Sequence, residues 1–325
     1  MRTGNNNQTA LDAPATRPPG FVHVDLDGLW TLAAGYGYPE RDAFERDPVF
    51  TLALPRLLGL LEELALPATF FICGRDLELP EKAAAVRAAI DAGHEAACHG
   101  YAHRLDLEQA PQAEIDLDMG RAVEAIEAAA GRRPIGHRAA GYGAGDRVLR
   151  AAARAGLRYD GSALPTRWAP LLRWGAGRLR RRVGEGTAAA GHGARYDAGD
   201  ASRAPQWHDP GEGLAPLLRL PLAVSPRLGL PLHASVGIML GQGAVSRGLT
   251  GLARLGHPIT YLLHGLDLLG GQELERRLPP GLARARPFRY DLGRRLAFVE
   301  SVLRRLAEVA DVELTERWLT RTDTD

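Results

Sequence analysis

Short apolar runs alternate with amphipathic segments along most of the chain. Runs typical of buried strands lie at residues 21–25, 69–73, 95–98, 135–137, 157–160, 217–224 and 258–264. Between or after these runs, apolar residues recur at helical spacing over residues 49–64, 81–92, 113–130, 147–155 and 287–310. Alternation of this kind predicts parallel strands joined by crossover helices, arranged either as an α/β barrel or as a doubly wound sheet.

The alternation breaks between about residues 166 and 213. This stretch holds Trp168 and Trp174, a long Gly/Ala-rich region, and a basic cluster made of Arg178, Arg180, Arg181 and Arg182. Such a length is unusual for a connection inside a compact domain, so the segment is either a functional insertion or disordered. The arginines fit two interpretations: a solvated loop, or a surface for anionic lipid or for a phosphate on the substrate.

The two ends of the chain differ from its middle. Residues 1–20 are polar and lack the apolar region of a signal peptide, so we expect a disordered lead-in. A single domain should cover residues 21–315, and the acidic, Thr-rich residues 316–325 should fray. No stretch of 18 uncharged apolar residues occurs, which predicts no membrane-spanning helix. The default location is cytoplasmic, with peripheral membrane contact through the insertion left open.

Composition narrows the class of protein only slightly. A chain of 325 residues, 45% of them hydrophobic, can bury a substantial core. The formal net charge of +1 gives no reason to expect a nucleic-acid partner. The two cysteines, Cys73 and Cys98, end strand-like runs, and we expect buried thiols rather than a disulfide.

Polar residues at the predicted strand ends are the candidates for chemistry. In an extended strand, His23, Asp25 and Asp27 share one face. His99 and His103 are four residues apart and converge if the backbone there turns. A carboxylate and two imidazoles form a common ligand set for a catalytic divalent metal ion. Zinc is the first expectation, and cobalt, nickel, manganese and iron fit the same donors.

Other strand-end residues belong to the same argument. Arg138, Asp160 and His264 also follow predicted strands, and a barrel gathers its chemistry at the C-terminal ends of its strands. His23 is either a satisfied core histidine or a further polar group of the pocket. His137 should point away from the pocket, because it alternates with Arg138.

Five motifs occur in a fixed order: VDLDG, HGYAH, GHRAAGYG, YDGS and LLHG. Together they resemble the polysaccharide deacetylase family, the NodB-homology or carbohydrate esterase family 4 proteins, over roughly residues 21–165 and 214–310. The resemblance implies a distorted (β/α)7-type barrel. It also implies a metal-dependent hydrolase that removes acyl groups from sugars.

The resemblance also implies roles for individual residues. Asp27, His99 and His103 would bind the metal ion. Asp25 would be the general base, Arg138 would orient or neutralise it, and His264 would be the general acid. The expected substrate contacts are Tyr142 or Gly143, whose backbone N–H groups would hold the oxyanion, together with Asp160 and Trp168.

The motifs also depart from the family pattern. Leu26 separates two acids that are usually adjacent, so the roles of Asp25 and Asp27 could be exchanged. Cys98, Gly100, His137 and Ala140 replace residues common in the family, which argues against strict chitin or peptidoglycan specificity. The spaced pair of acids resembles the deformylase-like, small-substrate branch more closely. The sequence thus predicts removal of an acetyl or formyl group from an aminosugar that is free, nucleotide-linked or lipid-linked. The alternatives are hydrolysis of a ureide or cyclic imide on the same fold, and a non-catalytic sugar- or lipid-binding relative.

Overall fold

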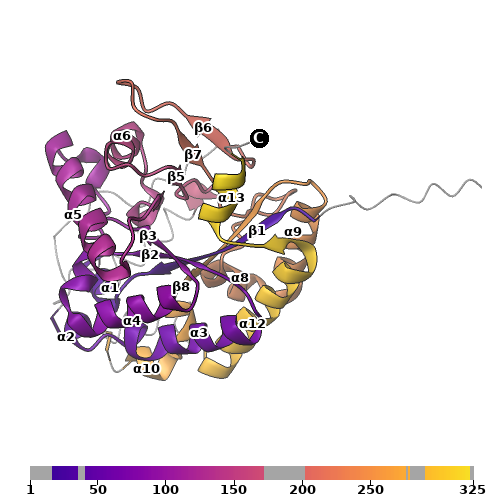
Figure 1. Cartoon of the computed structure of the whole chain (residues 1–325). Helices are drawn as coiled ribbons and strands as arrows, with labels where there is room; N and C mark the ends of the chain where they lie inside the picture. The colour runs from indigo at the N-terminus through magenta and orange to yellow at the C-terminus, as the bar shows by residue number, and fades with distance from the viewer. Residues whose placement is uncertain (1–16, 36–40, 172–201, 276, 279–289, 323–325) are drawn as a thin grey trace, which may run out of the picture.

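A computed structural model of the chain describes residues 17–35, 41–171, 202–275, 277–278 and 290–322 (Figure 1). The strands are β1 Pro19–Leu26, β2 Thr69–Ile72, β3 Glu95–Cys98, β4 Gly136–His137, β5 Tyr159–Asp160, β6 Gln206–His208, β7 Leu217–Arg219, β8 Ile259–His264 and β9 Asp311–Val312. The helices are α1 Leu29–Gly35, α2 Arg41–Glu45, α3 Leu54–Glu63, α4 Pro80–Asp91, α5 Gln112–Ala130, α6 Asp146–Arg154, α8 Ala234–Leu240, α9 Gln242–Ala253, α10 Gly271–Glu275, α12 Leu292–Val309 and α13 Thr315–Thr322. A π-helical turn, Val49–Ala53, leads into α3, and 3₁₀ turns occupy Gly74–Glu78, Leu107–Gln109, Ala140–Tyr142 and Gly265–Leu268.

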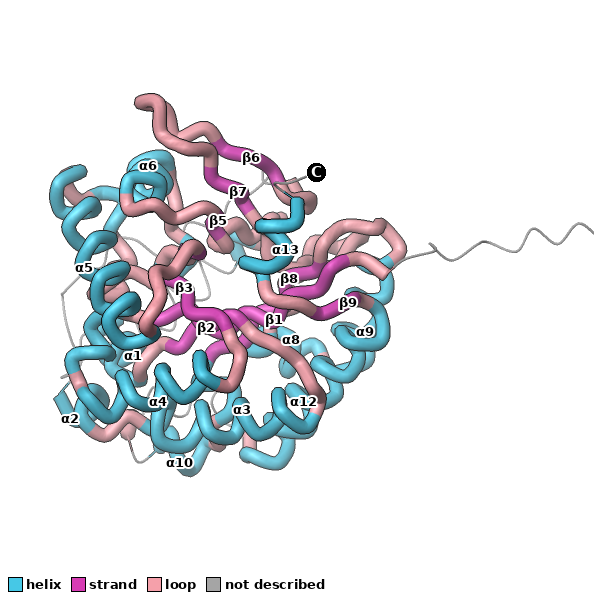
Figure 2. Tube along the Cα trace, in the orientation of Figure 1, coloured by secondary structure: helices cyan, strands magenta, loops and turns pink. Residues whose placement is uncertain are grey.

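Parallel strands form the centre of the structure. Within the described ranges, β8, β1, β2, β3, β4, β5 and β7 lie side by side in that order and run parallel. The sheet curls (magenta in Figure 2), and Leu222, just after β7, forms an isolated parallel bridge to Thr260 in β8. This arrangement confirms the predicted distorted α/β barrel and rules out the doubly wound sheet.

The two faces of β1 show how the barrel is filled. Val22, Val24 and Leu26 are buried in the main hydrophobic core, which the surrounding helices share. The alternate residues Phe21, His23 and Asp25 therefore face the interior of the barrel. A separate interior cluster there consists of Phe71, Ala97, Tyr159, Leu218 and Leu319.

The C-terminal residues close the base of the barrel, the end formed by the N-termini of the strands. We expected residues 316–325 to fray. For residues 316–322 this expectation is wrong, because Thr315–Thr322 form α13. Leu319 is fully buried in the interior cluster, and the Trp318 ring lies 5.3 Å from that of Phe21. Residues 323–325 lie outside the described part of the chain. Burial of these apolar side chains, rather than local helix propensity, holds α13 in place.

The predicted N-terminal lead-in and the insertion are each described in part. Pro19 and Gly20 belong to β1 and pair with β9, whereas residues 1–16 lie outside the described ranges. Within the insertion, residues 172–201 also lie outside them, including Trp174 and the four arginines. Strand β6 from the insertion pairs antiparallel with β7 and extends the sheet at its outer edge.

Two simpler expectations concern the cysteines and the membrane. Cys73 and Cys98 are buried and unbonded to each other, which confirms the prediction of buried thiols. None of the helices that the structure describes is long and apolar enough to cross a membrane.

Candidate active site

The predicted site residues meet at the C-terminal end of the barrel. Asp27 directly follows β1, and His99 directly follows β3. Arg138 follows β4, and His264 is the last residue of β8, where it pairs in register with Asp25 of β1. Because parallel strands end at the same edge of the sheet, four separate stretches of sequence contribute to one group.

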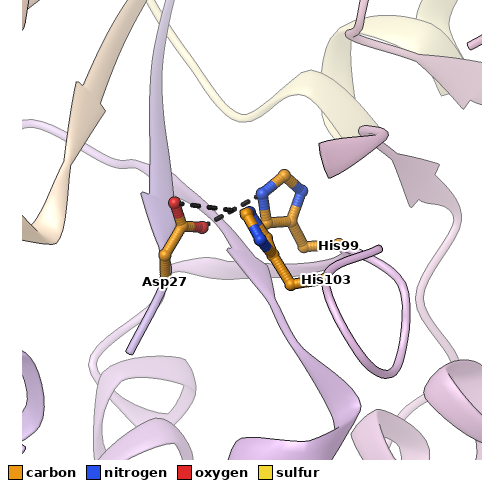
Figure 3. A group of neighbouring side chains, drawn as sticks. All are labelled: Asp27, His99 and His103. Carbon is orange, nitrogen blue, oxygen red and sulfur yellow. Dashed lines mark ion pairs between the residues drawn. The ribbon is translucent and has the colours of Figure 1, made fainter. Parts of the chain in front are cut away.

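Asp27, His99 and His103 form the candidate metal site. Their side chains point toward one another (Figure 3), and one potential ligand atom from each lies within 4.8 Å of the others. The His99 Nε2 atom is 3.0 Å from Asp27 Oδ1, and the His103 Nε2 atom is 3.7 Å from Asp27 Oδ2. The structure therefore brings together the three ligands that the sequence motifs predict.

A tight turn places His103 opposite His99. Gly100 and His103 both have positive φ angles, +74° and +48°. The Asp118 carboxylate accepts hydrogen bonds from the backbone N–H groups of Tyr101 (2.9 Å) and Ala102 (3.2 Å). Two local features, a left-handed backbone and a carboxylate from α5, thus hold the HGYAH segment in its turn.

A buried ionic group supports the loop that follows Asp27. The Asp47 carboxylate accepts hydrogen bonds from the Leu29 backbone N–H at 3.0 and 3.1 Å. Lys82 is 2% exposed and its ammonium lies 2.9 Å from Asp47 and 2.5 Å from Asp76. Since breaking a buried pair leaves an uncompensated charge, this group fixes the backbone beside Asp27 firmly.

The two imidazoles have the tautomer and the charge state that metal binding requires. The Nδ1 atom of His99 lies 2.7 Å from the Arg138 carbonyl oxygen, so Nδ1 carries the proton and Nε2 faces Asp27. Burial lowers the pKa of His103 to about 4, against the opposing charge of Asp27. His103 is therefore a neutral imidazole at physiological pH, the form that binds metals.

The site favours a positive charge between its side chains. Burial opposes ionisation of His99, but the charges of Asp25 and Asp27 outweigh it and raise the pKa of that imidazole. The buried Oδ1 atom of Asp27 has no hydrogen-bond partner in the described part of the chain, although His99 Nε2 is only 3.0 Å away. A proton or a cation between these two atoms would give the buried Asp27 oxygen the partner that it lacks. The residues present therefore fit a divalent metal ion.

Asp25 lies beside the metal group and is held from the other side by Arg138. Its Oδ1 atom accepts a hydrogen bond from Arg138 Nη1 at 2.7 Å. Its Oδ2 atom lies 4.0 Å from His99 Nε2 and 3.8 Å from His264 Nε2. Arg138 is fully buried and also donates from Nε to the Gly161 carbonyl at 2.8 Å. Arg138 thus holds one carboxylate oxygen of Asp25, and the other oxygen faces the imidazoles of His99 and His264.

His264 is held in a charged form by acidic neighbours. Burial alone would lower the pKa of His264, but the hydrogen bond to Asp267 and the charges of Asp25 and Asp267 raise it to about 9. Asp267 also accepts from the His264 backbone N–H at 2.8 Å and from the Ser235 hydroxyl at 2.9 Å. His264 is therefore protonated at neutral pH and oriented from behind.

The amides expected to hold an oxyanion are already used. The backbone N–H of Tyr142 donates to the Ala139 carbonyl at 3.1 Å, and that of Gly143 donates to Ala140 at 3.2 Å. The prediction that these two groups face the substrate is wrong for this conformation, because the 3₁₀ turn consumes both. The Tyr142 ring lies 6.4 Å from the ring of His233, on the His264 side of the site.

Asp160 and Trp168, the other expected substrate contacts, are not brought to the group. Asp160 is fully buried and bonds His137 at 2.9 Å and Ser162 at 2.6 Å, since it alternates with the inward-facing Tyr159. The prediction of a substrate contact is wrong for Asp160, because it leaves no exposed surface. The Trp168 indole N–H donates to the Leu228 carbonyl at 2.8 Å, which turns the ring toward the 225–230 loop.

Three contributors were not among the predicted site residues. His233, which no sequence motif singles out, stacks edge-on to His264 at 5.9 Å between ring centres, and its Nδ1 atom is buried without a partner among the described residues. Asp267, expected only as a loop cap or supporting residue, holds His264, and Asp118 holds the HGYAH turn. Only Asp267 carried a usable signal, its position three residues after a strand-end histidine.

The structure is a curled α/β barrel whose strand ends bring together one aspartate and two histidines. Residues 43–159 match the family model for polysaccharide deacetylase. A peptidoglycan deacetylase of Helicobacter pylori is 28% identical over 149 residues, 45% of this chain and 50% of the relative. The match thus spans half the length of that relative. Over residues 43–159 the chain is therefore similar to the polysaccharide deacetylase family, which confirms the resemblance of its motifs.

Solved structures support the fold. A polysaccharide deacetylase structure from Mycobacterium smegmatis matches with a TM-score of 0.53 at 20% identity, covering 94% of this chain and 96% of the other. A polysaccharide deacetylase structure from Pseudomonas aeruginosa PAO1 gives 0.57 at 14% identity, and the Puue allantoinase structure gives 0.58 at 14%; each match covers 92% of this chain and 88% of the other. At these identities the likeness concerns the fold alone.

Proposed function

We propose that the protein is a metal-dependent hydrolase that removes an acetyl or formyl group from the nitrogen of an aminosugar. The observation that carries the proposal is the convergence of Asp27, His99 and His103 beside Asp25 and His264. The similarity to the polysaccharide deacetylase family supports an acylated sugar as the substrate class. A bound divalent cation supplies Lewis-acid polarisation of the acyl carbonyl and lowers the pKa of water.

Asp25 is the base in this proposal. Its Oδ2 atom faces the group while Arg138 holds Oδ1 at 2.7 Å, so the carboxylate has one oxygen free to accept a proton from the attacking water. Asp27 rather than Asp25 lies among the imidazole nitrogens, which supports Asp27 as the ligand and argues against exchanged roles.

His264 is the acid. Its pKa of about 9 keeps it protonated at neutral pH, and its Nε2 atom lies on the same side as Asp25 Oδ2. From there it donates a proton to the departing nitrogen of the sugar. Asp267 and Ser235 orient the ring through Nδ1 and the backbone, leaving Nε2 directed at the site.

Metal analysis tests the site directly. His103→Ala removes a ligand, and His257→Ala removes an exposed histidine outside the group as a matched control. Zinc content of the purified proteins is measured by mass spectrometry after dialysis. We expect the wild type and His257→Ala to retain the metal and His103→Ala to lose it. Equal metal content in all three proteins would refute the assignment.

A substrate panel tests the reaction. The panel contains N-acetylated and N-formylated aminosugars, free, nucleotide-linked and lipid-linked, together with a ureide. Released acetate, formate and amine are measured with metal-loaded protein. Hydrolysis of a sugar amide supports the proposal, whereas hydrolysis of the ureide alone assigns the site to that chemistry. Binding of sugars without turnover would identify a non-catalytic relative.

A further inference from the structure

Arg138 has a second partner on the side away from Asp25. Its Nη2 atom lies 2.6 Å from His23 Nδ1, and because a guanidinium only donates, Nδ1 must accept. The ring is then neutral and carries its proton on Nε2, which lies 2.8 Å from the Thr315 hydroxyl. Burial and the charge of Arg138 hold the pKa of His23 well below its usual range, in agreement with the neutral form. His23, Arg138 and Thr315 are all fully buried.

Thr315 connects this pair to the base of the barrel. It is the first residue of α13, and its hydroxyl lies 3.5 Å from that of Thr69. Thr69 donates to Glu95 at 2.7 Å, and Glu95 also accepts from the Glu316 backbone N–H at 3.2 Å. A line of buried polar contacts therefore runs from Asp25 through the barrel interior to the first turn of α13.

Apolar side chains could have filled the barrel interior around His23, so its polar contacts call for an explanation. The His23 ring lies 4.9 Å from the Phe71 ring, in the apolar interior cluster. An apolar side chain in place of His23 would pack there but would leave Arg138 Nη2 without an acceptor, a costly arrangement for a buried charged group. With the Gly161 carbonyl on Nε and Asp25 on Nη1, the His23 acceptor completes the hydrogen bonds that fix the plane of the guanidinium.

We propose that His23 and Thr315 are positioning residues of the active site, and that α13 acts through them to fix Arg138 and hence the Asp25 carboxylate. The inference rests on the proposed function, in which Asp25 is the base. Small misplacements of a catalytic group cost large factors in rate, so the last helix of the described chain contributes to turnover from the opposite end of the barrel.

Four variants separate positioning from stability. Thr315→Val removes the hydroxyl at nearly constant volume, and Thr320→Val is the matched control on the exposed side of the same helix. His23→Gln keeps an acceptor for Arg138 and a donor for Thr315, whereas His23→Leu keeps neither. Each variant is assayed for kcat, KM and metal content on the sugar amide that the wild type hydrolyses best. NMR of the imidazole nitrogens in ¹⁵N-histidine-labelled protein reports the tautomer of His23 and its hydrogen bonds without needing a substrate.

A positioning role changes kcat and leaves KM and metal content unchanged, which a purely structural role would not do. Thr315→Val should lower kcat about tenfold with KM and metal content unchanged, the size of one lost hydrogen bond. His23→Leu should lower it about 100-fold, and His23→Gln should recover most of that loss. In the wild type, Nε2 of His23 should carry the proton, and its resonance should move in Thr315→Val but not in Thr320→Val.

Two results would overturn the proposal. Unchanged kcat in Thr315→Val and His23→Leu would remove any link to turnover, and protonated Nδ1 in the wild type would contradict the hydrogen bond from Arg138. If the wild type hydrolyses nothing on the panel, the proposed function fails, and the NMR measurements alone decide whether His23 and Thr315 hold Arg138.

Discussion

Glu95, at the base of the barrel, should make the stability of the protein depend on pH. Glu95 is fully buried, and burial, with the charge of Glu316 adding to it, raises its pKa from the ordinary 4.5 to about 7 despite hydrogen bonds from Thr69 and Tyr159. Between pH 4.5 and about 7, the folded state therefore holds a proton that the unfolded state has lost. This contribution to stability is fully present below pH 4.5 and is lost as the pH rises to about 7.

The size of the effect follows from the two pKa values. A tenfold difference in proton affinity corresponds to about 1.4 kcal/mol. The difference between 4.5 and about 7 therefore corresponds to about 3 kcal/mol. Glu95→Gln replaces the titrating group with a neutral one of similar shape. The free energy of unfolding of the variant minus that of the wild type should rise by about 3 kcal/mol from acidic to alkaline pH.

Urea denaturation of both proteins at several pH values from about 4 to 8 measures this difference, and other titrating groups cancel in the subtraction. Glu127→Gln, an exposed carboxylate on α5 that pairs with Arg133, is the matched control. A constant difference between Glu95→Gln and the wild type across the whole pH range would refute the reasoning.

Three further predictions concern packing and reactivity. Leu319→Ala should lower the free energy of unfolding by about 2–5 kcal/mol, measured by urea denaturation, because the side chain is fully buried; no change would mean that α13 is not docked. Gly136→Ala should destabilise the protein by at least about 1–3 kcal/mol in the same assay, since a Cβ there would lie 2.2 Å from the Tyr159 ring. Lys82 is the single lysine of the chain and is 2% exposed, so an acylating reagent should spare it in the native protein and modify it in denaturant, as intact mass will show. Rapid native acylation of Lys82 would contradict the buried pairs with Asp47 and Asp76.

The positions of the strand-end residues could be predicted because their signals are local. Asp27 follows an apolar strand, and His99 and His103 lie within one short motif, so register and spacing place all three. Parallel strands then gather such residues at one edge without any knowledge of distant contacts. The same reasoning explains why Arg138, as expected, contacts Asp25.

The failures involve contacts that no local pattern encodes. Helix α13 has too few apolar residues to produce a periodic signal. Even so, Trp318 packs against Phe21, and Leu319 belongs to the interior cluster. His233 has no partner near it in sequence and meets His264 only through the fold. Asp160 occupies a motif position, but strand alternation turns it away from the interior.

The docking of α13 joins segments that are synthesised at very different times. His23 and Thr315 are 292 positions apart, so their hydrogen bond forms only after all the residues between them have been synthesised. Until then His23 Nε2 lacks its partner and the apolar interior at the base of the barrel is uncovered, and exposed apolar surface of this kind favours chaperone binding. A stop codon within this helix should therefore lower the yield of folded protein.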